Sequence, residues 1–400
     1  MRLLVIVDTY VPARISGALQ MRDLVREMRA QGHDPTVVVP APEQTEGWRI
    51  EHVDGVEVLR VKTLQTKDIG KARRALAEWW LPYGLLQGLR RSPLAATQWD
   101  GLVWYSPTIF LGPMVRALKR QWGARGYLIL RDLFPDWTVD AGIMRKGLVY
   151  RWFKRVERQQ YAVADVIGVQ TPANAALVRL DSPPGASIEV LNNWLAAPPA
   201  TASSIDLATG PLAGRTVFAY TGNMGVAQGM DCLVDLALRL RDREDVGFLF
   251  VGRGSEVPRL RRIVTEQGLE NVMFVDEVDA HEIPGLLAQC HVGLIALDPR
   301  HTTHNIPGKL LTYLHAGLPV LARINAGNDL EDLIHSEGVG LAVSGDDQDR
   351  LLAHACTMVD DAVARERMAC KGRELGQRMF SPAQAVRQVI AGLQPTGARP

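Results

Sequence analysis

Cysteine is scarce in this chain, and no stretch is apolar for long enough to cross a bilayer. The four cysteines, Cys232, Cys290, Cys356 and Cys370, are widely spaced and form no Cys-x-x-Cys pair. This spacing argues against a zinc site or a disulfide framework, so we expect four buried thiols. No apolar run reaches the roughly 18 residues of a membrane span, and Met1 leads straight into an apolar strand rather than a signal peptide. We therefore expect a protein that stays in the cytosol.

An excess of one charge is also lacking, because the formal net charge is only +1 over 400 residues. This near-neutrality gives no overall attraction to nucleic acid. Residues 1–195 nevertheless carry 26 Lys+Arg against 19 Asp+Glu. Their cations gather around aromatic residues in segments 67–91 and 145–158, a mixture typical of interfacial helices on anionic lipid. For the second segment, helices with buried aromatics and basic outer faces are an equal alternative.

Short β-branched runs alternate with amphipathic helical segments along the whole chain. This alternation predicts parallel sheets covered by helices on both faces. In the first half we expect strands at residues 2–7, 36–39, 56–61, 101–104, 126–130 and 166–169. In the second half we expect them at residues 216–221, 247–251, 272–275, 292–296, 319–322 and 340–343. The series runs twice, so the sequence predicts two doubly wound α/β domains.

The boundary between these domains is expected within residues 181–214, which are rich in Pro, Ala, Ser and Thr. Such a composition suits a linker. We place the first domain at residues 1–195, the linker at 196–214, the second domain at 215–380 and a terminal segment at 381–400. A final helix from about 383 to 392 is expected to pack back on the first domain. Ligands of α/β sheets bind at the carboxyl ends of the strands, so we expect the functional cleft there.

The segment HNIPGKLLTYLHAGLPV, residues 304–320, carries the strongest chemical signal. It predicts a helix that begins near Lys309, carries leucines at helical spacing and stops at Gly317 before a buried strand. A helix N-terminus carries about half a positive charge and several unpaired N–H groups. Asn305 to Lys309 could therefore hold the phosphates of a nucleotide. The alternative is an ordinary helix and strand with an incidental lysine.

A glycine-containing loop, TGNMGVAQG, follows the first strand of the second half. Gly222, Gly225 and Gly229 would let the backbone approach a bound anion, while Asn223 and Gln228 add neutral hydrogen-bonding groups. This pattern indicates a phosphate loop without a cation.

A second loop, VGRGSE, follows the next strand, and there Gly252 and Gly254 flank Arg253. The guanidinium of Arg253 could bind phosphate or sugar with two parallel hydrogen bonds. Neither loop has the GxGxxG spelling of a dinucleotide-binding motif, which would also need an acidic residue about 20 positions later.

The order of these motifs resembles that of the family 4 retaining glycosyltransferases of the GT-B fold, over nearly the whole chain. The first half contains VDTYVPARISGALQMRDLVREMRAQGHDPTVVV, and the second contains YTGNMGVAQG, VGRGSE, VMFVDEV and KLLTYLHAGLPV. The phrases LRDLFPDW, GNMGVAQG and HNIPGK are most similar to transferases of N-acetylfucosamine or a related amino sugar in O-antigen and capsule assembly. The resemblance implies two Rossmann-like doubly wound domains facing across a cleft, the first on the acceptor side and the second binding a nucleotide sugar.

The chain departs from the family pattern at positions that touch the chemistry. Two glutamates that the family commonly has fall on His304 and Thr312, and its usual Arg and Lys fall on Asn223 and Gln228. The resemblance therefore excludes a carboxylate nucleophile at either glutamate position. It leaves a route in which the departing diphosphate helps to deprotonate the acceptor hydroxyl on the same face of the sugar. Lys309 would stabilise this leaving group, and His304 would donate a hydrogen bond or be merely structural.

The remaining site residues follow from the same resemblance. The expected donor-binding residues are Gly222, Asn223, Gly225, Gln228, Gly252, Arg253, Gly254, Asn305 and Thr312. On the acceptor side, Arg131 and Asp132 follow a predicted strand, with Asp132 as a candidate base or sugar-hydroxyl acceptor. A structural Arg131–Asp132 pair is the alternative. Gly17 would let a backbone amide approach the reacting groups, although Ser16 stands where a second glycine is common.

No metal or other cofactor is expected. A metal-dependent transferase would place an Asp-x-Asp motif at a strand end to hold the ion through oxygen ligands. The only such spelling is Asp347-Gln348-Asp349, which precedes a helical run. We therefore expect Asp346 or Asp347 to cap that helix.

The leading hypothesis is a retaining transferase that uses a UDP-sugar donor and a polyprenyl-diphosphate-linked saccharide acceptor. It would work in O-antigen or capsule biosynthesis as a cytoplasmic protein held peripherally at the inner membrane face, with no nucleic-acid partner. Two other classes stay open: a nucleotide-sugar 2-epimerase on the same fold, and a non-catalytic sugar-nucleotide or membrane-binding protein. Donor hydrolysis or transfer, or epimer formation without an acceptor, would separate them.

Overall fold

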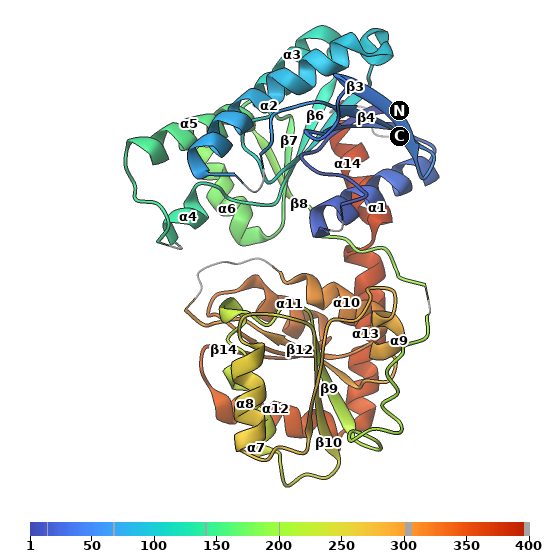
Figure 1. Cartoon of the computed structure of the whole chain (residues 1–400), viewed down its shortest axis with the longest axis vertical. Helices are drawn as coiled ribbons and strands as arrows, with labels where there is room; N and C mark the ends of the chain where they lie inside the picture. The colour runs from blue at the N-terminus through green and yellow to red at the C-terminus, as the bar shows by residue number, and fades with distance from the viewer. Residues whose placement is uncertain (14, 67–68, 141, 200, 301–305, 396–400) are drawn as a thin grey trace. The chain divides into compact units, whose positions relative to one another are not determined.

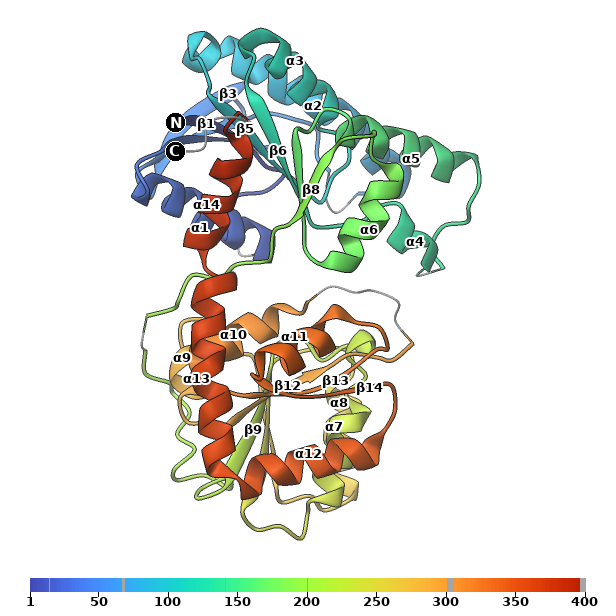
Figure 2. The same cartoon turned by 180° about the vertical axis from the view of Figure 1, so that it is seen from behind.

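The computed structural model describes residues 1–13, 15–66, 69–140, 142–199, 201–300 and 306–395. The chain forms two compact units, shown from opposite sides in Figures 1 and 2. Unit 1 comprises Met1–Trp194 and Pro382–Pro400, and unit 2 comprises Leu195–Ser381. The chain therefore leaves unit 1, completes unit 2 and then returns.

An eight-stranded sheet forms the centre of unit 1, in the order β3-β4-β2-β1-β5-β6-β7-β8. Its strands are β1 (Arg2–Ile6), β2 (Asp34–Pro40), β3 (Trp48–Val53), β4 (Val56–Val61), β5 (Gly101–Ser106), β6 (Arg125–Leu130), β7 (Val166–Val169) and β8 (Ser187–Val190). Neighbouring strands pair in parallel except β3, which runs antiparallel to β4. The interior strand β1 reads as a continuous apolar run from Leu3 to Ile6 because both of its faces are covered.

Helices cover both faces of this sheet, as Figures 1 and 2 show. On one face, α1 (Ser16–Ala30) and the last helix, α14 (Pro382–Leu393), share a core cluster with β1. On the other face lie α2 (Lys71–Arg91), α3 (Gly112–Trp122), α5 (Leu148–Tyr161) and α6 (Pro172–Asp181). Two short elements, η1 (Pro93–Ala96) and α4 (Asp136–Asp140), complete the unit. Unit 1 is thus doubly wound, and its final helix comes from the far end of the sequence.

Unit 2 has a six-stranded, wholly parallel sheet in the order β11-β10-β9-β12-β13-β14. The strands are β9 (Thr216–Thr221), β10 (Val246–Val251), β11 (Val272–Val275), β12 (Val292–Ala296), β13 (Val320–Ile324) and β14 (Gly340–Ser344). One face is covered by α9 (Ile283–Leu287), α10 (Gly308–Ala316), α11 (Asp329–Glu337) and α13 (Ala362–Met379). The other face is covered by α7 (Asp231–Arg239), α8 (Val257–Glu266) and α12 (Gln348–Asp360).

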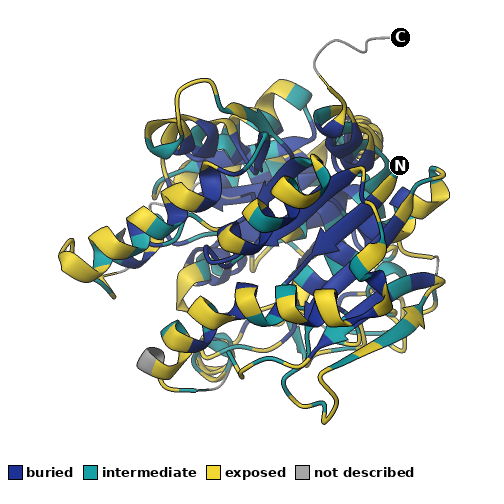
Figure 3. Cartoon of the chain, turned by 90° about the horizontal axis from the view of Figure 1, so that it is seen from above, coloured by how far each residue is buried: buried dark blue, intermediate teal, exposed yellow. Residues whose placement is uncertain are grey.

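Burial follows this layering. In Figure 3 the central strands are buried, whereas the helices alternate between buried and exposed strips. The edge strands β3, β8 and β11 are only partly buried. Among the described residues, no helix is both long and apolar enough to cross a bilayer.

The predicted fold class is confirmed, because both units are doubly wound parallel-sheet domains. Every predicted strand is present, with ends that differ by at most two residues. The predicted helix stop is also confirmed, since Gly317 ends α10 in the left-handed conformation with φ 69°. Asp347 caps α12 as expected, because its side chain accepts a hydrogen bond from the Arg350 amide.

Two strands were not predicted. The edge strand β3 pairs with β4 through a tight turn in which Asp54 and Gly55 have φ values of 52° and 76°. An Asp-Gly pair between alternating apolar residues is a hairpin signal and could have revealed it. Strand β8 has only four residues, none of them fully buried, and lies within the Pro-rich segment interpreted as a linker. Its apolar pattern is too weak to predict a strand from the sequence.

The segment expected to be a linker lies against unit 2. Leu207 and Leu212 belong to the core of this unit, and the Leu207 amide donates to Oε1 of Gln289 at 2.8 Å. Packing of these two leucines therefore outweighs the flexible composition of the segment.

The expectation of four buried thiols is confirmed at two positions only. Cys232 and Cys290 are buried and Cys356 is half-buried, but Cys370 lies exposed on α13. All four are free cysteines.

Candidate active site

The two glycine loops of unit 2 pack backbone against backbone at the carboxyl ends of β9 and β10. The Gly222 amide donates to the Val251 carbonyl at 2.9 Å, and the Met224 amide donates to the Arg253 carbonyl at 2.8 Å. A Cβ atom on Gly252 would lie 2.2 Å from the Gly222 carbonyl oxygen, and φ at Gly252 is 135°. Only glycine fits there, so this residue sets the approach of the loops to each other.

Gly254 has the same role two residues further along the second loop. Its φ is 158°, and a Cβ atom would lie 2.1 Å from the Met224 carbonyl oxygen. In the first loop, Gln228 accepts hydrogen bonds from the Gly225 amide at 3.0 Å and from Nδ2 of Asn223 at 3.2 Å. Gly225, Gln228 and Gly254 therefore set the shape of the two loops through contacts within and between them.

Lys309 is the second residue of α10 and reaches back over the first loop. A Cβ atom on Gly222 would lie 3.4 Å from its Cε, and its Nζ lies 4.8 Å from the centroid of the Tyr220 ring. Desolvation by burial lowers the pKa of Lys309 to about 8. Among the described residues, no carboxylate forms an ion pair with it. A half-buried ammonium that no described carboxylate pairs with, at a helix N-terminus, favours a bound anion.

A pocket of about 400 Å³ opens between these loops and α10, within the size range of small-ligand sites. Its lining includes six of the expected donor-binding or catalytic residues: Gly222, Asn223, Gly252, Arg253, Lys309 and Thr312. Thr312 stands one helical turn after Lys309 on the same face of α10. The structure thus brings together residues from three separate segments of the sequence, while His304 and Asn305 lie outside the described residues.

Sequence reasoning missed two residues of this site. Glu277 lines the pocket and forms an ion pair with Arg253, with Oε2 and Nη1 3.2 Å apart and both side chains largely exposed. Arg253 is therefore partly neutralised at the rim. Tyr220 lies beneath Lys309, and its hydroxyl donates to the Asn223 carbonyl at 2.7 Å. An acidic residue shortly after a strand was a visible signal for Glu277, but nothing in the sequence marked Tyr220.

In unit 1, the expected acceptor-side residues lie near the carboxyl ends of neighbouring strands. A Cβ atom on Gly17 would lie 3.1 Å from the hydroxyl oxygen of Tyr105. Desolvation raises the pKa of Tyr105 to about 12, with Arg131 opposing and Asp132 adding to the shift. Desolvation also raises the pKa of Asp132, and the charge of Asp8 adds to this while Arg131 opposes it. These residues therefore form one electrostatic group.

Arg131 and Asp132 differ sharply in exposure. The guanidinium of Arg131 is buried, donates to the Leu191 carbonyl at 2.8 Å and lies 5.1 Å from the centroid of the Trp194 ring. Asp132 lies at the surface. The structure therefore gives Arg131 a place in the packing of the chain after β8, and its predicted role in acceptor binding stays a prediction. Asp132 is the one of the pair that a ligand can reach.

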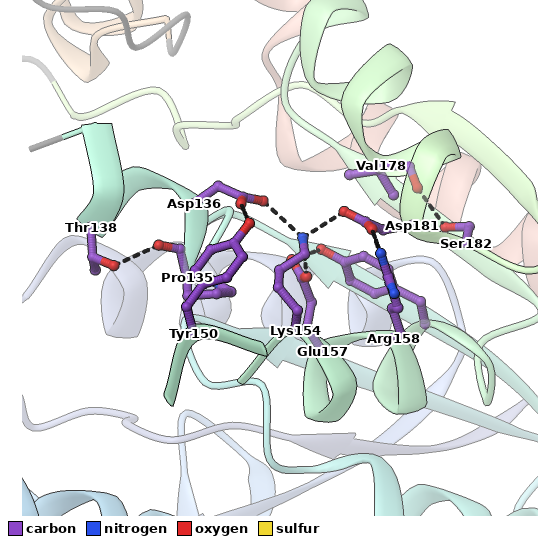
Figure 4. Close-up of polar contacts among 11 residues, drawn as sticks. Pro135, Asp136, Thr138, Tyr150, Lys154, Glu157, Arg158, Val178, Asp181 and Ser182 are labelled. Carbon is purple, nitrogen blue, oxygen red and sulfur yellow. Dashed lines mark hydrogen bonds and ion pairs between the residues drawn. The ribbon is translucent and has the colours of Figure 1, made fainter. Parts of the chain in front are cut away.

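A cluster of ionisable residues centred on the buried Lys154 ties α4, α5 and α6 together in unit 1 (Figure 4). Nζ of Lys154 contacts carboxylate oxygens of Asp136 at 2.8 Å and Asp181 at 2.5 Å, and also contacts Glu157. Three acidic side chains grouped so closely could hold a metal ion, but here they surround the ammonium of Lys154. This cluster therefore stabilises the packing of three helices. A second group of side chains that could hold a metal ion, Asp279, His281 and Glu282, lies towards the surface of unit 2.

Two family descriptions match most of the chain. Residues 17–194 match the glycosyl transferase 4-like domain, and residues 215–361 match the glycosyl transferases group 1 domain. Together these regions include every predicted site residue, and their limits fall close to the two structural units.

Two curated relatives are glycosyltransferases by name. The putative colanic acid biosynthesis glycosyl transferase WcaI of Escherichia coli is 24% identical, over 98% of this chain and 99% of WcaI. The probable glycosyltransferase WbjE of Pseudomonas aeruginosa is 26% identical over 230 residues, or 56% of this chain. That alignment spans 57% of the length of WbjE.

Solved structures share the whole fold. Sucrose-phosphate synthase from Thermosynechococcus elongatus has a TM-score of 0.71 at 16% identity, covering 98% of each chain. Anabaena HepE, solved in complex with UDP, has a TM-score of 0.69 at 15% identity, covering 98% of this chain and 99% of its own. At these identities the likeness shows the fold alone, which is GT-B. With both of its domains matched, the chain belongs to the glycosyltransferases, built from a glycosyl transferase 4-like domain followed by a group 1 domain.

Proposed function

We propose that this glycosyltransferase moves a sugar from UDP to a lipid-linked saccharide, with retention of configuration, in the assembly of a cell-surface polysaccharide. The observation that carries the proposal is the half-buried ammonium of Lys309, which lines the pocket beside two glycine loops and forms no ion pair with any described carboxylate. A diphosphate would supply the missing charge. The name of WcaI supports a role in polysaccharide assembly, and the UDP complex of HepE supports UDP as the nucleotide.

In the proposed reaction the bond between the anomeric carbon and the UDP oxygen breaks while the acceptor oxygen bonds to that carbon on the same face. The proton of the acceptor hydroxyl passes to the departing phosphate oxygen. Lys309 stabilises the charge that develops on the diphosphate, and the helix start adds its N–H groups. Thr312 offers a hydroxyl to the ligand, but it cannot act as a nucleophilic carboxylate. His304 and Asn305 keep the hydrogen-bonding roles that the sequence predicts for them.

We propose no metal ion or other cofactor for this reaction. The positive charge on the donor side comes from Lys309, from the partly paired Arg253 and from the α10 N-terminus. The proposed sugar is an N-acetylated amino or deoxyamino sugar such as N-acetylfucosamine. Its support is the resemblance of LRDLFPDW, GNMGVAQG and HNIPGK to transferases of such sugars.

The proposed acceptor is a polyprenyl-diphosphate-linked saccharide, with the protein held peripherally at the cytoplasmic face of the inner membrane. Support comes from α2, where Leu76, Trp79, Trp80 and Tyr83 are all exposed and arginines lie towards both ends. Such a mixture suits the membrane interface. Asp132 of unit 1 is the proposed hydrogen-bond acceptor for the saccharide.

The first test is ligand-induced thermal stabilisation with UDP, GDP and ADP, with and without EDTA. Ligand at 100 times its dissociation constant should add about 2.7 kcal/mol to the free energy of unfolding. A selective UDP shift that EDTA leaves unchanged is expected, whereas a shift that needs metal contradicts the metal-free site. Incubation with UDP-amino sugars then reports hydrolysis or transfer. Epimer formation without an acceptor would favour an isomerase instead, and no turnover would favour a binding protein.

A further inference from the structure

Helix α2 borders a hollow of about 710 Å³ that the donor site does not use. The hollow is lined by residues of α2 and by residues 62–64, which follow β4, and it lies wholly within unit 1. Its lining consists of Lys62, Thr63, Leu64, Trp80, Leu81, Tyr83, Gly84, Leu86, Gln87, Arg90 and Arg91. We call it the α2 hollow.

Two glycines of α2 lie against β4 and the residues that follow it. A Cβ atom on Gly88 would lie 2.3 Å from Cγ1 of Val61, so the helix can approach β4 only with glycine at this position. A Cβ atom on Gly84 would meet only Cγ2 of Thr63, at an ordinary 3.6 Å. Glycine in a helix interior is otherwise unfavourable relative to alanine. At Gly84 packing does not demand it, and its missing side chain leaves the hollow open.

The walls of the α2 hollow combine apolar and cationic groups. Leu64, Trp80 and Tyr83 are exposed, with the rings of Trp80 and Tyr83 5.7 Å apart in an edge-on arrangement. Arg90 and Arg91 are exposed at the end of α2. Among the residues that the structure describes, this lining contains three cations and no carboxylate.

Many arginines of this protein pair with a carboxylate, as Arg74 does with Glu78 near the start of the same helix. In contrast, neither Arg90 nor Arg91 forms an ion pair with any residue that the structure describes, and Nζ of Lys62 donates to the Thr45 carbonyl at 3.2 Å. Three cations that no described carboxylate pairs with, beside an apolar wall, match a ligand that carries an anionic end and an apolar chain.

We propose that the α2 hollow binds the phosphate-bearing end of a polyprenyl phosphate or diphosphate lipid. The phosphate would contact Lys62, Arg90 and Arg91, and the first isoprene units would lie along Leu64, Trp80 and Tyr83. The identity of this lipid rests on the proposed function, in which the acceptor saccharide is carried on a polyprenyl diphosphate. The proposed function gives α2 a general affinity for the membrane. The α2 hollow would add a defined binding site that selects polyprenyl phosphate over other anionic lipids of equal charge.

The test uses the full chain and two kinds of phosphatidylcholine vesicle, doped with either polyprenyl monophosphate or phosphatidylglycerol to the same surface charge. The wild type should bind the polyprenyl phosphate vesicles about tenfold more tightly. Gly84→Leu places a branched side chain in the hollow while keeping every cation, so it should lose this preference and still bind the phosphatidylglycerol vesicles. Gly84→Ala, which adds only a Cβ in ordinary contact, is the matched control and should keep the preference.

A second pair of variants separates the site from general electrostatics. Arg90→Ala/Arg91→Ala should abolish the preference, whereas Arg73→Ala/Arg74→Ala, at the other end of α2, should weaken binding to both vesicles alike. The proposal is overturned if the wild type binds both vesicles equally, if Gly84→Leu keeps the preference, or if millimolar inorganic phosphate displaces the protein equally from both.

The lipid-binding test and the donor-site test can fail separately. A protein that shows UDP-dependent turnover without lipid preference would lose only the α2 hollow proposal. A protein that prefers polyprenyl phosphate but binds no nucleotide would lose the proposed transfer reaction and keep the lipid site.

Discussion

The ammonium nitrogen of Lys309 lies 4.8 Å from the centroid of the Tyr220 ring, although the two residues come from a helix and a strand far apart in the sequence. The hydroxyl of Tyr220 in turn donates to the Asn223 carbonyl in the first glycine loop. An aromatic face attracts a cation without neutralising it. The lysine is therefore held over the loop with its charge still available to an anion.

Replacing Lys309 by alanine should lower kcat by about 100-fold to 1,000-fold, the usual loss when one group that stabilises developing negative charge is removed. The fold should survive, because the substitution removes a desolvated charge rather than an apolar contact. Turnover with a UDP-sugar and the thermal midpoint together check this. A folded Lys309→Ala protein with normal turnover would refute the leaving-group role.

Stabilisation by UDP should weaken as the pH rises through about 8, because burial lowers the pKa of Lys309 to that value. A bound diphosphate favours the charged lysine, so binding is coupled to proton uptake above this pH. In the free protein the sign is opposite: between about 8 and the ordinary value of 10.5 the unfolded chain binds more protons, so this site adds stability as the pH rises. Thermal shifts measured below and above pH 8 test both effects, and Lys309→Met should remove them.

Gly252→Ala should destabilise unit 2 by more than about 3 kcal/mol, since it combines left-handed backbone strain with a clash. The new Cβ would lie 2.2 Å from the Gly222 carbonyl oxygen. Gly268→Ala is the matched control, because Gly268 has φ 61° and open space around it. It should cost only about 1 to 2 kcal/mol. Denaturant unfolding measures both, and equal losses would show that loop packing does not depend on Gly252.

The cluster around Lys154 should make unit 1 less stable as the pH rises from about 5 to 8. Desolvation raises the pKa of Glu157 to about 7, against the opposing charge of Lys154. The folded state therefore binds more protons than the unfolded state over this range, and a shift of one unit is worth about 1.4 kcal/mol. We expect a loss of roughly 1 to 3 kcal/mol at this site.

Glu157→Gln isolates this contribution, since the amide oxygen can still accept the hydrogen bond that the Tyr161 hydroxyl donates to Oε1. Denaturant unfolding of both proteins at pH 5 and pH 8 gives the difference. A pH dependence that is the same in the variant and the wild type would show that Glu157 is ionised throughout.

The central strands of unit 2 are predictable from the sequence because they are buried on both faces. β9 and β12 lie at the predicted residues, since a central parallel strand reads as an uninterrupted apolar run. The edge strands β3 and β8 are only partly buried, and β8 has just four residues, so this apolar signal is weaker there. The C-terminal helix was visible from its amphipathic pattern.

The donor pocket was predictable as a set of loops, because glycine, lysine and strand order are local features. Contacts between those loops were not. Tyr220 beneath Lys309 and Glu277 beside Arg253 depend on the register of β9, β10 and β11, which residue spacing does not give. Likewise the sequence left open whether Arg131 was exposed, and its burial against Trp194 follows only from the packed fold.

The return of α14 to unit 1 affects how this protein is made. Val386 and Val389 of α14 belong to the same core cluster as Leu3 and Val5 of β1. A ribosome delivers domains from the N-terminus onward, at about 5 to 20 residues per second. Part of one face of the unit 1 sheet therefore stays uncovered while all of unit 2 is synthesised, and the domain begun first is the last to be finished.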